Sequence, residues 1–181
     1  MEIGEKLEIG SETCSDNKET LNMPYIELTR GQSALVDADD FEKLKSIKWH
    51  AHKDLLSGKF RAYRHVIGTR HKTQEMSYFL MGTKDGFVLD HKNRNILDYR
   101  KENLRWATTQ ENCRNRLRTK KSGLPQGVFK NSGRFTARIG LGKGIRKTLG
   151  TFLTPEVAFA AYVEAANNYF GEFSPYKNVC V

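Results

Sequence analysis

The sequence predicts an α+β protein of two small domains, and three observations lead to this. A length of 181 residues permits one ordinary domain or two small ones. Strand-like alternation occurs on both sides of residues 117–124, whose basic and flexible composition marks a linker. The charge is uneven: residues 1–112 carry 18 basic and 18 acidic side chains, whereas residues 113–181 carry 12 and 3. Such a basic block favours a polyanionic partner, nucleic acid before membrane, although charge kept for solubility is the alternative.

The first domain is expected to follow a mobile arm. Residues 1–23 are polar, net acidic and without sustained periodicity, as is typical of a mobile terminus. From Tyr25 onward, short strands surround one helix, for which residues 37–40 supply the N-cap. The predicted elements are strands around residues 26–28, 34–36, 49–53 and 60–66, a turn at 57–58 and a helix over 41–47.

Three histidines of this domain, His50, His52 and His65, raise the question of a metal site. A period of two places His50 and His52 on one face of a strand. No cysteine or acidic side chain accompanies them, as a metal site would require. We therefore favour polar face residues, near nucleic-acid phosphates, over metal ligands.

The basic C-terminal segment is predicted to form a three-stranded antiparallel sheet covered by one helix. Turn sequences at residues 131–133 and 142–144 separate the strands. Thr154 caps the helix, and Pro155 occupies its first position. The predicted elements are strands over 127–130, 134–141 and 145–152, and a helix that runs to about residue 171.

Alternation along the middle strand predicts which side chains face the helix and which face away. Phe135, Ala137 and Ile139 should pack on the helix, and the residues between them should form the outer face. Lys147 breaks this pattern in the third strand, because its position should point to the core. A bulge, or a lysine stem that reaches past the core, is therefore expected there.

The cysteines and the apolar segments limit the possible compartments. Cys14, Cys113 and Cys180 are odd in number, far apart and without a C-x-x-C pair, which argues against a disulfide framework or a thiolate zinc site. We expect a protein of the reducing cytoplasm. The first 20 residues lack the apolar core of a secretory signal, and the longest apolar run, 157–163, is too short to cross a bilayer.

A polar, Asn-rich stretch in the middle of the chain carries the candidate chemistry. Residues 87–89 should enter as a strand and 104–106 should leave as its partner, with a long loop between them that amide side chains can hold together. Residues 108–111, TTQE, form a capping box, so a helix should begin there and run through Asn112 and Arg116. A helix packed across such a hairpin would bring Asp90, His91 and Asn112 together.

These residue types suit the hydrolysis of a phosphodiester. Asp90 and Asn112 offer hard oxygen donors for a divalent cation. His91 can take a proton from water near neutral pH, and the side-chain oxygen of Asn103 is a candidate to fix its tautomer. The alternative is a single buried histidine beside amides that only stabilise the loop.

Residues 88–116, with VLDHKNRN, ENLRWAT and QENCRNR, resemble the HNH nuclease motif of the ββα-metal fold, most closely that of phage and intron homing endonucleases. The resemblance implies that Asp90 and Asn112 bind one Mg²⁺ or Mn²⁺ ion, that His91 is the general base and that Asn103 supports it. The chain has Ser77 and Tyr78 where relatives often carry His-Arg. It also has Asp-Tyr-Arg at 98–100 where they often carry Asp-Asn-Arg.

Residues 125–174 resemble the APETALA2-type DNA-binding domain through GVFK, RFTARI, LGTF and the helix TPEVAFAAYVEAANNYFGEF. The resemblance implies that the outer face of the sheet enters the major groove. Phe129 and Thr148 stand where that family commonly has aromatic residues on its DNA face. With two arginines that follow Asn112, the candidate DNA contacts are Lys130, Arg134, Thr136, Arg138, Arg146, Thr148, Arg114 and Arg116.

Together these patterns predict a mobile arm over 1–23, an HNH nuclease domain over 24–119 and an APETALA2-type domain over 120–181. The expected protein is a monomeric, metal-dependent endonuclease that nicks double-stranded DNA in the cytoplasm of a phage-infected or bacterial cell. A DNA-binding regulator with an inactive nuclease scaffold is the alternative, and an RNA-directed nuclease is a weaker one. The joint presence of Asp90, His91, Asn103 and Asn112 favours the enzyme.

Overall fold

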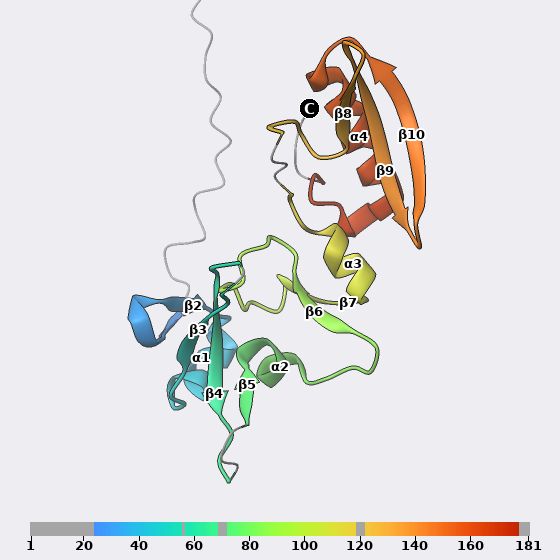
Figure 1. The fold of residues 1–181 in the computed structure, drawn as a ribbon. Helices are drawn as coiled ribbons and strands as arrows, with labels where there is room; N and C mark the ends of the chain where they lie inside the picture. The colour runs from blue at the N-terminus through green and yellow to red at the C-terminus, as the bar shows by residue number, and fades with distance from the viewer. Residues whose placement is uncertain (1–23, 56, 69–71, 119–121, 178–181) are drawn as a thin grey trace, which may run out of the picture.

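The computed structural model describes residues 24–55, 57–68, 72–118 and 122–177 (Figure 1). The predicted arm over 1–23 lies outside these residues, as does the middle of the predicted linker. The described chain forms the expected mixture of antiparallel sheets and short helices. None of its helices combines the length and the apolar character that crossing a bilayer would need.

The N-terminal part consists of two small sheets around a common core. β1 (Tyr25–Glu27) pairs with β2 (Ser33–Leu35), and β4 lies between β3 and β5 in the second sheet. Tyr99, from the later Asn-rich loop, is fully buried in the same core as Leu44 and Trp49. The remaining elements are η2 (Thr29–Gly31), α1 (Ala38–Lys45), β3 (His50–Lys53), β4 (Phe60–His65), β5 (Thr73–Glu75) and α2 (Met76–Met81).

The strand–loop–strand–helix unit predicted from the middle of the sequence is present. β6 (Val88–His91) pairs antiparallel with β7 (Leu104–Ala107), and α3 (Thr109–Arg114) follows. The capping box is confirmed, because Thr108 accepts from the Glu111 N–H while the Glu111 carboxylate accepts from the Thr108 N–H. The expectation that the helix runs through Arg116 is wrong: at Asn115 the backbone leaves the helical conformation, and the Asn115 side chain turns back to β6.

The C-terminal part has the predicted architecture, a three-stranded antiparallel sheet with one helix on one face (Figure 1). Ile139 of the middle strand is buried against Val163 and Ala166 of the helix. Gly127 has a left-handed φ of +79°, and a Cβ there would collide with the ring of Tyr162, so glycine is required on both counts. The elements are β8 (Val128–Asn131), β9 (Arg134–Gly142), β10 (Ile145–Phe152), α4 (Pro155–Phe170) and η3 (Gly171–Phe173).

The irregularity expected at Lys147 is confirmed. The pairing of β10 with β9 shifts register on both sides of Lys147, between Ile145 and Arg146 and again between Thr148 and Gly150. The Lys147 ammonium donates to the hydroxyl of Tyr169 on α4, at 2.7 Å. The lysine stem therefore crosses the edge of the core and brings its charge out to the surface.

Candidate active site

The hairpin of β6 and β7 determines which side chains meet at the site. Asp90 lies opposite Arg105 across the strand pair, so their side chains share one face of the hairpin. α3 packs on both strands, and its capping box fixes the point at which the helix leaves β7. The local fold thus places Asp90 beside Arg105 and the end of α3, while His91, the next residue of β6, turns its ring to Tyr99. The predicted convergence of Asp90, His91 and Asn112 stays a prediction.

The Asp90 carboxylate is buried, with 6% of the residue exposed, and its two oxygens are used unequally. Its Oδ2 accepts two hydrogen bonds from the Arg105 guanidinium, at 2.9 and 2.7 Å, and one from Asn115 Nδ2 at 3.0 Å. Its Oδ1 accepts a single longer bond from Asn115, at 3.2 Å. Arg105 and Asn115 therefore fix the orientation of the carboxylate and leave Oδ1 the less occupied oxygen.

Sequence reasoning missed Arg105 and Asn115 as parts of the site. Asn115 is 4% exposed, and its amide also donates to the His91 carbonyl oxygen at 2.9 Å, so it ties the end of α3 to β6. A signal was available for Asn115, because it follows Asn112 by three residues and so lies one helical turn further on. For Arg105 the signal was its place opposite Asp90 once the two strands are paired in this register.

The His91 side chain is buried, and its Nε2 has no hydrogen-bond partner among the described residues. Its ring lies edge-on to the ring of Tyr99, with 5.5 Å between ring centroids. Burial first, and then the positive charges of Arg61 and Lys59, lower the pKa of His91 to about 4, against the opposing effect of Asp98. The imidazole is therefore neutral at pH 7 and can accept a proton at Nε2.

The Asn103 amide holds the loop between β6 and β7. Its oxygen accepts from the Asn93 N–H at 2.9 Å, and its nitrogen donates to the Asp98 carbonyl oxygen at 2.8 Å. The predicted contact of Asn103 with the His91 ring is not among the hydrogen bonds of the described residues. Asn103 instead fixes the loop that carries Tyr99 against His91.

The two departures from the HNH pattern are accommodated in the structure by packing and hydrogen bonding. The Tyr99 hydroxyl accepts from the Ala62 N–H at 2.8 Å, so the loop is anchored to β4. The Ser77 hydroxyl donates to Glu75 at 3.0 Å, and Tyr78 lies beside Trp106 of β7. These side chains therefore connect α2, β4 and the central hairpin.

Two side chains of this unit, Asp90 and Asn112, carry oxygen donors of the kind that Mg²⁺ prefers. Asn112 lies half-buried on α3, and its side-chain amide makes no hydrogen bond within the described part of the chain. Asp90 Oδ1 is the second available oxygen. The described residues contain no group of three or more His, Cys, Asp or Glu side chains that could hold a metal ion. A cation here would thus take two protein ligands and complete its shell with water or substrate oxygens, as Mg²⁺ commonly does.

The C-terminal module contacts the hairpin of β6 and β7 and the loop between these strands. Arg105 donates to the Glu172 carbonyl oxygen and lies 4.1 Å from the centre of the Phe173 ring. Arg94 donates to the carbonyl oxygen of Pro175 at 3.0 Å. Arg114, a predicted DNA contact, lies over the ring of Phe170 and donates a long hydrogen bond to β9.

The remaining predicted DNA contacts differ in exposure. Thr136 is only 6% exposed, and its hydroxyl shares a hydrogen bond with Thr151 across the strands. The guanidinium of Arg138 lies 5.7 Å from the centre of the Phe129 ring on β8. The exposed candidates are Lys130, Arg134, Arg138, Arg146 and Thr148 on the sheet, and Arg116 after α3.

Comparison with known proteins identifies the central unit. Residues 82–114 match the family model described as HNH endonuclease, and this range includes β6, β7, α3 and all four predicted catalytic and metal-binding residues. No curated protein and no solved structure matches the chain. Residues 82–114 of this chain are therefore an HNH endonuclease domain.

Proposed function

We propose that the chain is a metal-dependent DNA endonuclease of the homing type that nicks one strand of a duplex. The observation that carries the proposal is the His91 imidazole, which is neutral, buried and unpartnered at Nε2, within a segment that matches HNH endonucleases. A buried nitrogen without a partner is rare unless it has a functional use. A water molecule beside the scissile phosphate would supply that partner.

The proposed chemistry divides among a few side chains. His91 accepts a proton from the attacking water at Nε2. Asp90 and Asn112 would hold the divalent ion through their side-chain oxygens, while Arg105 and Asn115 keep the Asp90 carboxylate in position. When bound, the ion would stabilise the charge that develops on the phosphate and the leaving oxygen. One base and one ion serve one strand, so a monomer is expected to nick.

Recognition is assigned to the C-terminal module as an APETALA2-type domain. Its sheet has one face covered by α4 and an outer face that carries the exposed Arg134, Arg138 and Arg146. A sheet face with arginines matches a known way in which β-structure enters the major groove. The charge of residues 113–181 supports the same assignment, because phosphate contacts provide most of the affinity for a duplex.

A DNA-binding regulator with an inactive nuclease scaffold is the second candidate. It is favoured by the hydrogen bonds that Arg105 and Asn115 already make to Asp90, because a carboxylate that is held by a guanidinium can be purely structural. The free Asn112 amide and the unpartnered His91 nitrogen favour the enzyme instead.

A plasmid nicking assay separates the two. The full-length protein would be incubated with supercoiled plasmid that carries DNA of the source genome, with Mg²⁺, with Mn²⁺ and with excess chelator. The enzyme should produce open circles with either ion and none with chelator, and His91→Gln should produce almost none. Binding without nicking under all conditions would favour the regulator, and nicking that survives chelation would contradict the metal assignment.

A further inference from the structure

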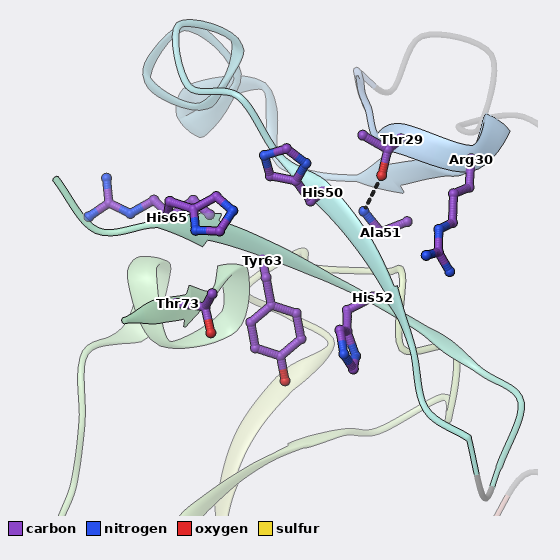
Figure 2. Close-up of a pocket in the computed structure, with 9 residues that line it drawn as sticks. Thr29, Arg30, His50, Ala51, His52, Tyr63, His65 and Thr73 are labelled. Carbon is purple, nitrogen blue, oxygen red and sulfur yellow. Dashed lines mark hydrogen bonds between the residues drawn. The ribbon is translucent and has the colours of Figure 1, made fainter. Parts of the chain in front are cut away.

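The N-terminal module carries a pocket of about 470 Å³ that the proposed chemistry does not use (Figure 2). It opens on the face of β3, β4 and β5 that is turned away from the core, and η2 forms its rim. Arg30, three histidines, Tyr63 and Thr73 are among its lining residues. None of the lining residues is acidic, and the carboxylate that the Tyr63 hydroxyl contacts, Glu75, is buried and paired with Arg61.

Strand register explains why these side chains converge. His50 lies opposite Tyr63, and His65 lies opposite Thr73, so all four point to the same face of the sheet. The rings of His50 and His65 meet edge-to-face with 5.2 Å between centroids, and His52 packs in the same way on Tyr63. Figure 2 shows the His50 ring near His65 and the His52 ring near Tyr63.

The hydrogen-bonding groups of the pocket are largely uncommitted. The imidazoles of His50, His52 and His65 have ring contacts but no hydrogen bond or ion pair within the described residues. The same holds for the exposed guanidinium of Arg30. By contrast, the Thr29 hydroxyl accepts from the Ala51 N–H and so fixes η2 on β3. A concave surface thus presents several free donors, and the Glu75 carboxylate that accepts from the Tyr63 hydroxyl is already paired with Arg61.

The pocket and the active site belong to one continuous part of the module. The hydroxyl of Tyr99 accepts from Ala62, which lies between Arg61 and Tyr63 on β4, and the other edge of the Tyr99 side chain meets His91. β4 therefore connects the histidine pocket directly to the loop beside the proposed general base.

We infer that the pocket binds a backbone phosphate of the DNA substrate, at a position away from the phosphodiester that is cut. Arg30 and the free imidazole nitrogens supply the donors that a phosphate oxygen requires, and Arg contacts to phosphates are strong because the charge assists the hydrogen bond. The inference rests on the proposed function in that DNA is the substrate. This phosphate contact would give the N-terminal part, whose basic and acidic side chains balance, a local affinity for DNA that its net charge does not indicate.

The test measures DNA affinity of the full-length protein with chelator present, so that no cutting occurs. Anisotropy of a labelled duplex would be recorded from 50 to 200 mM salt for the parent, for Arg30→Ala and for the double variant His50→Gln, His65→Gln. Loss of one phosphate contact should lower the salt slope by about one unit. When salt rises from 50 to 200 mM, the affinity of Arg30→Ala should therefore fall by a factor that is roughly 3 to 4 times smaller than the factor for the parent. The double variant should bind more weakly at 50 mM salt.

Lys48→Ala is the matched control, because Lys48 is an exposed cation of the same module that does not line the pocket. It should keep the slope of the parent, and thermal melting would establish that all variants are folded. Unchanged affinity and slope in both pocket variants would overturn the inference. The inference would also be overturned if the parent lost DNA binding when zinc was removed and regained it when zinc was added. The histidines would then hold a metal.

The outcomes also separate this inference from the proposed function. If the parent protein binds DNA but never nicks it, and Arg30→Ala has a lower salt slope, the proposed nuclease activity would be wrong and the phosphate site in the pocket would be supported. If the parent nicks DNA and the pocket variants bind DNA as the parent does, the proposed nuclease activity would be supported and the phosphate site in the pocket would be wrong.

Discussion

The β6–β7–α3 unit and the β8–β10 sheet place their polar groups in opposite situations. In the first, Arg105 and Asn115 are buried and both donate to the buried Asp90 carboxylate, and His91 Nε2 is a buried atom without a partner among the described residues. In the second, Arg134 and Arg146 stand exposed on a strand face. A reacting group has to be held in place before the substrate arrives, whereas a group that pairs with DNA gains its partner on binding. Buried polar groups that are already hydrogen-bonded, as around Asp90, are what a catalytic site needs. Exposed arginines, as on the β8–β10 sheet, are what a DNA-binding surface needs.

The largest expected effect is on the rate of nicking. His91→Ala should lower the nicking rate by about 10²–10⁴-fold, because removal of a general base typically costs that much. DNA affinity measured with chelator should stay within about twofold, since a buried imidazole does not contribute to the exposed binding surface. Single-turnover nicking and anisotropy on the same duplex give the two numbers. A variant that cuts at the rate of the parent would show that the base has been misassigned.

The two proposed metal ligands should differ in their effect on stability. Asp90→Ala leaves the Arg105 guanidinium buried without its carboxylate, which should cost about 3–5 kcal/mol in free energy of unfolding. Asn112→Ala removes a side chain without hydrogen bonds and should cost less than about 1 kcal/mol. Both should lose metal-dependent nicking. Urea unfolding and Mn²⁺ titration calorimetry would check this, and an Asn112→Ala protein that binds Mn²⁺ like the parent would contradict the ligand set.

Acid should destabilise the metal-free protein through His91. The pKa of His91 is lowered to about 4 in the folded state, against about 6.5 when unfolded, so unfolding takes up a proton between these values. The free energy of unfolding should therefore fall as the pH drops from 6.5 toward 4, by at most about 3 kcal/mol. Urea unfolding of the parent and of His91→Gln across this range isolates the effect, because all other groups are shared. Parallel pH profiles would contradict the buried, neutral imidazole.

The smallest effects are expected on the exposed face of the C-terminal sheet. Alanine at Arg134, Arg138 or Arg146 should cost roughly 1–3 kcal/mol on one DNA sequence if that residue reads a base. At a phosphate it should weaken all sequences and lower the salt slope by about one unit. Lys143→Ala, in the exposed turn before β10, is a control. If all three variants bind like the control on a panel of duplexes, the recognition face lies elsewhere.

Features set by local sequence were predictable. Strand alternation, the Thr108 capping box and the Pro155 helix start are each decided within a few residues, and the structure confirms them. β5 was not predicted, because its three residues, TQE, carry no apolar alternation and become a strand only by pairing with β4. The positions of Arg105 and Asn115 were missed for a related reason: their bonds to Asp90 span 15 and 25 residues of sequence.

Arg105 connects the C-terminal module directly to the Asp90 carboxylate. Its guanidinium donates hydrogen bonds to Asp90 from two of its nitrogens and to the carbonyl oxygen of Glu172 from the third. A shift of the C-terminal module, such as one caused by a poorly fitting DNA sequence, would therefore pull on the side chain that orients Asp90. Correct docking and correct ligand geometry would then be achieved together, so the fidelity of cutting could exceed the fidelity of binding.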